Sequence, residues 1–84
     1  MKKTKILRKP GFSLTAILAA NIRAYRDDKG LSQEDFANIC GLHRTYVGSV
    51  ERGERNVTLS TLEIFASVMG VSVPQLLTGK TPKK

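Results

Sequence analysis

Residues 33–52 read QEDFANICGLHRTYVGSVER and carry the clearest helix and turn signals in the chain. Ser32, just before it, is a preferred N-cap residue, and Asp35 three residues later can complete a variant of the capping box. A helix is therefore predicted to begin here. Its apolar side chains recur on one helical face, at Phe36, Ala37 and Cys40. The helix is only about two turns long, because Gly41 tolerates a positive φ and lets the chain turn.

A second helix is predicted to follow the glycine turn and to begin at His43 or Arg44. Val47 and Val50, spaced i, i+3, form its buried side, and Leu42 packs under the turn. Its open face carries hydrogen-bonding side chains, namely His43, Arg44, Thr45, Ser49 and Arg52. Two short helices joined by a tight turn, the second with a polar open face, form a helix-turn-helix, whose second helix enters the DNA major groove.

The motif resembles the helix-turn-helix of the lambda and phage 434 repressors and Cro, the XRE-like family, in the spacing of Ala37, Gly41, Val47 and Val50. The flanks IRAYRDDKGLSQEDFA and VERGERNVTLSTLEIFASVMGVS extend the resemblance over residues 14–77. Within the family, LHRTYVGSVERGERNVTL is most similar to the controller proteins of restriction-modification systems. The resemblance implies a compact all-α, five-helix lambda-repressor-like domain. It also implies a homodimer that binds palindromic operators and activates or represses its own operon, with RNA polymerase as a candidate partner.

The first predicted helix precedes the motif. Ser13 can cap it and Gly30 ends it, with a buried stripe of Leu14, Leu18, Ile22 and Tyr25. Arg23 and Arg26 are assigned to different sides of this helix. The resemblance implies that Arg26 pairs with Glu51 in a largely buried ion pair, so both residues are interpreted as structural.

Two further helices are predicted after the motif. Thr58 or Ser60 can cap the fourth, which Gly70 closes. Its apolar face is Leu59, Leu62, Phe65, Ala66 and Met69. Ser72 begins the fifth, which runs through Leu77.

A homodimer is also expected from size. A chain of 84 residues makes one small domain, and such a domain buries only about 60% of its unfolded surface, so association helps its stability. The last two helices carry more apolar side chains than so small a domain can hide. The predicted interface residues are Ile64, Phe65, Val68, Val71, Val73 and Leu76.

The net charge of +7 is concentrated at the chain ends. Residues 1–11 carry +5, residues 80–84 carry +3, and the part between them carries −1. We interpret residues 12–79 as the DNA-binding domain and residues 80–84 as a basic tail. Residues 1–11 are expected to form a flexible arm, which either attracts DNA phosphates or is a solvated end.

Each polar residue of the motif region has an expected DNA contact. Arginine pairs bidentately with guanine, and residues at the start of a recognition helix approach base edges. The predicted base-reading residues are Arg44, Thr45, Ser49 and Arg52. The predicted backbone contacts are Gln33, His43, Tyr46, Arg55 and Asn56, although Tyr46 could instead pack and His43 could simply cap its helix. The resemblance implies that Gln33 grips a phosphate.

The sequence argues against an enzyme. His43 and Ser49 would lie about 9 Å apart along a helix and roughly 240° apart around it, too far for a nucleophile and its base. One histidine and one cysteine, on different helices, make no metal site, and no cofactor motif occurs. Cys40 is interpreted as a small buried hydrophobe.

We expect a bacterial cytoplasmic protein that associates with the nucleoid. No stretch reaches the roughly 18 to 20 apolar residues that a membrane span needs. The alternatives to a controller protein are a phage-type repressor, and an antitoxin-like protein that regulates its own gene and binds a partner toxin.

Overall fold

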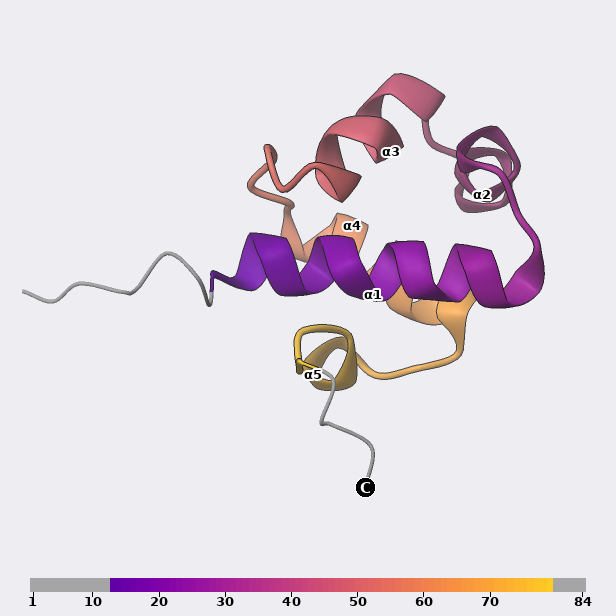
Figure 1. Ribbon diagram of the computed structural model, residues 1–84. Helices are drawn as coiled ribbons and strands as arrows, with labels where there is room; N and C mark the ends of the chain where they lie inside the picture. The colour runs from indigo at the N-terminus through magenta and orange to yellow at the C-terminus, as the bar shows by residue number, and fades with distance from the viewer. Residues whose placement is uncertain (1–12, 80–84) are drawn as a thin grey trace, which may run out of the picture.

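The computed structural model describes residues 13–79, which contain helices and no strand. In chain order the elements are α1 (Leu14–Lys29), α2 (Gln33–Cys40), α3 (Arg44–Glu51), α4 (Leu59–Met69) and α5 (Val73–Leu76). The long helix α1 runs through the middle of the molecule, with α2 and α3 on one side of it and α5 on the other (Figure 1). The predicted all-α, five-helix fold is confirmed.

The helix ends follow local capping chemistry. Ser32 Oγ accepts a hydrogen bond from the Asp35 N–H at 2.9 Å, and Asp35 Oδ2 accepts one from the Ser32 N–H at 3.1 Å, so the predicted capping box is present. Gly41 ends α2 with a φ of 73°, a left-handed conformation that favours glycine. Thr58, not Ser60, caps α4. These caps set the length of each helix before any packing is considered.

The core lies where the five helices meet. Its largest fully buried side chains are Phe36, Phe65, Ile22, Leu76, Val47 and Val50. The rings of Phe36 and Phe65 stack with their centroids 5.9 Å apart, which joins α2 to α4. Phe65 and Leu76 were predicted to form a dimer interface, and that prediction is wrong for both because they are buried inside the protomer.

Two apolar side chains predicted to be buried are exposed. Leu14 is 57% exposed and Leu59 is 77% exposed. Each is the first residue of its helix, and Leu18 and Leu62, one turn further along, are buried. The helical periodicity gives the correct apolar face, but the first position of that face is exposed in both helices.

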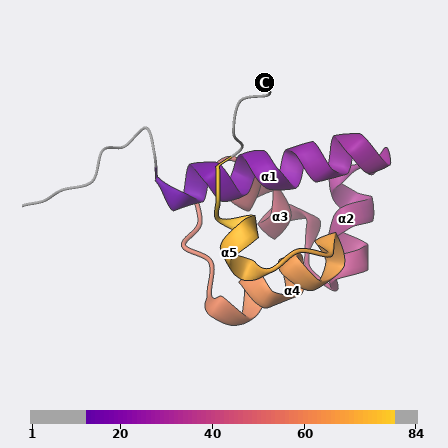
Figure 2. The same cartoon turned by 90° about the horizontal axis from the view of Figure 1, so that it is seen from below.

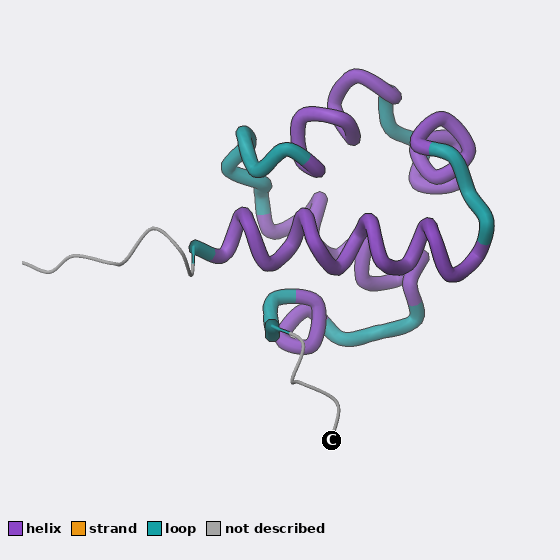
Figure 3. The backbone as a smooth tube through the Cα atoms, in the orientation of Figure 1, coloured by secondary structure: helices purple, strands orange, loops and turns teal. Residues whose placement is uncertain are grey.

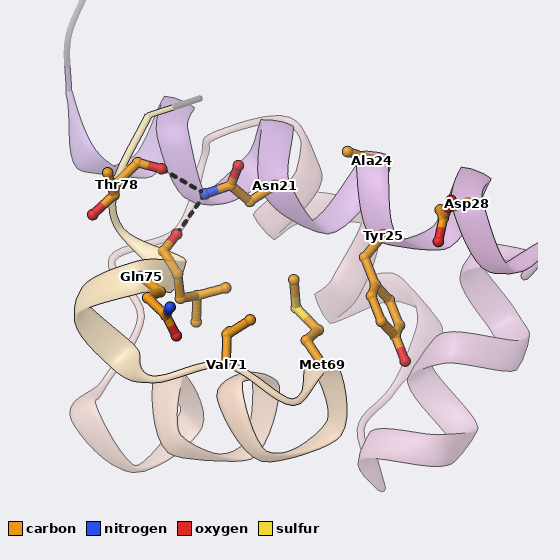
Figure 4. A pocket seen from close by; sticks show the side chains of 9 residues that line it. Asn21, Ala24, Tyr25, Asp28, Met69, Val71, Gln75 and Thr78 are labelled. Carbon is orange, nitrogen blue, oxygen red and sulfur yellow. Dashed lines mark hydrogen bonds between the residues drawn. The ribbon is translucent and has the colours of Figure 1, made fainter. Parts of the chain in front are cut away.

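Helix α5 lies against both α1 and α4 (Figure 2). The Asn21 Nδ2 group on α1 donates hydrogen bonds to the Leu76 carbonyl at 2.7 Å and to the Thr78 carbonyl at 3.2 Å (Figure 4). These bonds satisfy carbonyls that the short helix leaves without partners. The four-residue helix is thereby fixed to the longest one.

Candidate nucleic-acid interface

The N-terminal end of α3 presents three exposed polar side chains, those of His43, Arg44 and Thr45. They line an open hollow together with Glu34, Asn38 and Leu42 from the preceding helix and turn. His43 makes no side-chain capping bond. Within residues 13–79, the side chains of Arg44 and Thr45 have no protein hydrogen-bond partner, so their donors and acceptors face outward. A helix N-terminus also attracts anions, because its first N–H groups lack partners.

The opposite side of α3 is fixed to the core. Val47 and Val50 are fully buried there, as predicted. Gly48 is also buried, and a Cβ atom there would come 3.3 Å from Gln33 Oε1 on α2 and 3.4 Å from Arg52 Nη1. Both atoms are at the far ends of flexible side chains, so a larger residue would push these polar groups aside.

The C-terminal end of α3 is held by a bidentate ion pair. Arg26 Nε donates to Glu51 Oε2 at 2.7 Å, and Arg26 Nη2 donates to Glu51 Oε1 at 2.9 Å. The two side chains are 15% and 3% exposed, so the pair is largely buried. The hydrogen bond to the Glu51 carboxylate raises the pKa of Arg26. The guanidinium therefore stays charged, and the pair joins α1 to α3.

Two further side chains converge on Glu51. Arg23 Nη1 donates to the Glu51 carbonyl, and Gln33 Nε2 donates to Glu51 Oε1 at 3.1 Å. The assignment of Arg23 and Arg26 to different sides of α1 is wrong, because residues three apart in a helix share a face. That spacing was the sequence signal for the role of Arg23. Gln33, predicted as a phosphate contact, also has this structural bond.

Ser49 does not lie on the open face of α3, and this part of the prediction is wrong. The residue is only 7% exposed. Its hydroxyl donates to the Tyr46 carbonyl at 2.7 Å and accepts from Arg55 Nε at 2.9 Å. The loop between α3 and α4 bends sharply (Figure 3), with Gly53 at a φ of 74°, and its Arg55 side chain contacts the Ser49 hydroxyl.

The other loop residues remain at the surface. Arg52 and Glu54 form an exposed ion pair, with Nε and Oε2 3.1 Å apart. The guanidinium of Arg55 lies over the ring of Tyr46, 5.2 Å from its centroid. Tyr46 is half-buried and packs against the core, so the packing alternative for this residue is observed. Asn56 is exposed.

Other chemistries find little support in the described part of the chain. Residues 13–79 hold no group of three or more His, Cys, Asp or Glu side chains that could bind a metal ion. Burial raises the pKa of the Cys40 thiol to about 11, so this cysteine is not an activated nucleophile. No helix among the described residues is long and apolar enough to cross a membrane.

A helix-turn-helix with an exposed polar N-terminal end on its second helix, held to a small helical core, defines a DNA-binding domain. Residues 22–76 match the helix-turn-helix family HTH_3, and the chain belongs to this XRE-like family of transcription regulators.

Three relatives resemble this chain in sequence or in structure. The control protein C.SmaI from Serratia marcescens is 66% identical over 62 residues, which cover 74% of each chain. The restriction-modification controller C.AhdI from Aeromonas hydrophila superposes with a TM-score of 0.67 at 40% identity, covering 74% of this chain and 94% of that one. The biofilm regulator SinR, solved in complex with DNA, gives a TM-score of 0.67 at 34% identity, covering 73% and 98%. These relatives are control proteins and regulators, not enzymes.

Proposed function

We propose that this protein is a restriction-modification controller that binds a palindromic operator as a homodimer and regulates its own operon. The observation that carries the proposal is the outward-facing Arg44 and Thr45 at the start of α3, in a chain 66% identical to a control protein over 62 residues. The protein would act at the nucleoid in the bacterial cytoplasm. RNA polymerase is the candidate protein partner where the controller activates transcription.

Base reading falls to the exposed side chains near α3. Arg44 has all five N–H donors available to fork onto a guanine edge, and Thr45 adds a hydroxyl next to it. Only Nε of Arg52 is engaged, in an exposed ion pair with Glu54 that solvent already screens, so its terminal N–H groups can still reach DNA. Ser49 is removed from this set, because its hydroxyl is enclosed by the loop.

Other residues are proposed to contact the DNA backbone beside the base-reading residues. Gln33 at the start of α2, His43 before α3, and Tyr46, Arg55 and Asn56 nearby are proposed to grip phosphates. The predicted basic arm, residues 1–11, and the tail, residues 80–84, lie outside the described residues. Both remain predictions, which a salt titration of truncated chains would test.

The dimer interface is proposed on the apolar side chains of α4 and α5 that the protomer leaves accessible. Ile64 and Val71 are each 36% exposed, and Val68 and Val73 are half-buried. Ile64→Asp should weaken self-association and, with it, operator binding. The matched control is Leu59→Asp, which changes a more exposed leucine on the same helix outside the proposed interface. Equal sedimentation of the two variants would contradict this interface.

Footprinting on the DNA upstream of the protein's own gene tests the function as a whole. Wild-type protein should protect two half-sites centred about one helical turn, roughly 34 Å, apart, because a two-fold dimer presents two recognition helices at that spacing. Arg44→Ala should lose the footprint at the same concentration. A protected region without two-fold symmetry, or no protection at all, would refute the dimeric operator.

A further inference from the structure

The buried hydroxyl of Ser49 joins two parts of the interface that the sequence separates. It donates to the carbonyl of Tyr46 on the preceding turn of α3 and accepts from Arg55 Nε in the following loop. The loop is held nearby because the Glu54 N–H donates to the Ser49 carbonyl at 3.0 Å. Both oxygens of this serine therefore hold the polypeptide together at the end of α3.

Arg55 is fixed at two points. Its Nε group is held by Ser49 at 2.9 Å, and its guanidinium lies over the Tyr46 ring, 5.2 Å from the centroid. A planar guanidinium restrained by a hydrogen bond on one edge and by a ring on one face has a defined orientation. The four terminal N–H groups of Arg55 have no partner in the part of the chain that the structure describes. They form the edge that binds a phosphate bidentately.

We infer that Ser49 is a positioning residue that orients Arg55 on Tyr46 before DNA arrives, so that the free edge of the guanidinium grips one backbone phosphate in each half-site. This inference rests on the proposed DNA-binding function. An unrestrained arginine loses side-chain conformational entropy when it binds DNA, and this loss weakens binding. An arginine that is already restrained in the free protein loses less. Ser49 therefore strengthens DNA binding without contacting DNA and without reading a base.

Ser49→Ala tests the inference, because alanine removes only the hydroxyl and favours the helix. The variant should fold normally and bind every DNA sequence about two- to tenfold more weakly per half-site, the effect of immobilising one flexible side chain. The effect should vanish in an Arg55→Ala background, where no guanidinium remains to be oriented. Ser67→Ala is the matched control, because Ser67 is exposed on α4 and has no side-chain hydrogen bond within residues 13–79.

A spectroscopic readout in the free protein separates positioning from a general structural role. In ¹⁵N-labelled protein the Arg55 Nε–H signal should exchange slowly with water and show a ring-current shift from Tyr46. Ser49→Ala should move this signal toward that of a free arginine, while Ser67→Ala should leave it unchanged. An unchanged Arg55 signal in Ser49→Ala overturns the inference.

The binding outcomes are equally decisive. A changed ranking of operator sequences, persisting in the Arg55→Ala background, means that Ser49 reads a base, and this overturns the inference. A loss of affinity that only follows a loss of folded protein overturns it too. If the wild type binds DNA and the Ser49→Ala variant binds equally well, this inference is refuted and the proposed function is not. A wild type that binds no upstream DNA refutes the proposed function, and with it the DNA role of Arg55.

Discussion

The two ends of α3 use arginine in opposite ways. At the C-terminal end, Arg26 donates from Nε and Nη2 to the carboxylate of Glu51 and from Nη1 to the carbonyl of Leu31. At the N-terminal end, Arg44 is exposed and donates to no described residue. The first arginine is largely satisfied within the protein, whereas the donors of the second are unpaired among the described residues. The same residue type therefore has its N–H groups occupied at one end of the helix and available at the other.

The largest effect is expected for the stability of the protein when Arg26, at the C-terminal end of α3, is replaced. Arg26→Ala leaves the buried Glu51 carboxylate without its bidentate partner, which should lower the free energy of unfolding by about 3 to 5 kcal/mol. Urea unfolding followed by circular dichroism measures this. Arg44→Ala is the matched control and should unfold like the wild type. Similar unfolding curves for the two variants would remove the distinction between the two arginines.

The next largest effect is expected for DNA affinity when Arg44, at the N-terminal end of α3, is replaced. Arg44→Ala should weaken operator binding by about 1 to 3 kcal/mol per half-site and relax the preference at one base pair. Arg44→Lys should restore the charge but only part of the preference, because an ammonium lacks the planar fork. Binding to operators varied at every position measures both. If wild type and Arg44→Ala rank these operators identically, Arg44 contacts a phosphate, and base reading passes to Thr45 and Arg52.

Gln33 bonds to Glu51 at the C-terminal end of α3 and is also proposed to contact DNA. Its side chain donates to Glu51 at 3.1 Å, and its position at the start of α2 suits a phosphate. Gln33→Ala should lower the free energy of unfolding by about 0.5 to 1.5 kcal/mol, the net value of one hydrogen bond. The same variant should also bind all DNA sequences more weakly, and by a similar factor. Asn38→Ala, an exposed change on the same helix, controls for stability; equal unfolding of the two variants would show that the Gln33 bond contributes nothing.

The smallest effect is expected from the ionisation of Cys40, which changes the free energy of unfolding only at alkaline pH. Its raised pKa of about 11 keeps the folded-state thiol protonated, so its stabilising contribution is complete below the ordinary value of 9.0. That contribution is lost as the pH rises from there toward 11, because only the unfolded state ionises easily. Urea unfolding at pH 8 and pH 10.5 should therefore show a larger loss for wild type than for Cys40→Ala. Parallel losses would contradict the raised pKa.

The helix boundaries could be predicted because their causes are local. Ser32, Asp35 and Gly41 lie within a few residues of the backbone groups that they satisfy, so the sequence alone shows the capping box and the turn. The outward position of Arg44 was predictable for a similar reason, since it follows from the buried spacing of Val47 and Val50. The Arg26–Glu51 pair came from the family resemblance instead.

The errors arose where one element covers another. Ser49 seemed open from the periodicity of α3, but the loop containing Arg55 folds over it. Phe65 and Leu76 could not be separated from the accessible Ile64 by composition, because the choice depends on how α4 and α5 pack. Long-range packing decides such cases, and periodicity within one helix carries no information about it.

The bond between Asn21 and Leu76 spans 55 residues of chain. Bringing such distant segments together has a loop-closure entropy cost that local helix formation does not have. A four-residue helix is also too short to be stable alone. We therefore expect α5 to dock last during folding and to detach first in native-state hydrogen exchange, so that amides of α5 lose protection before those of α1.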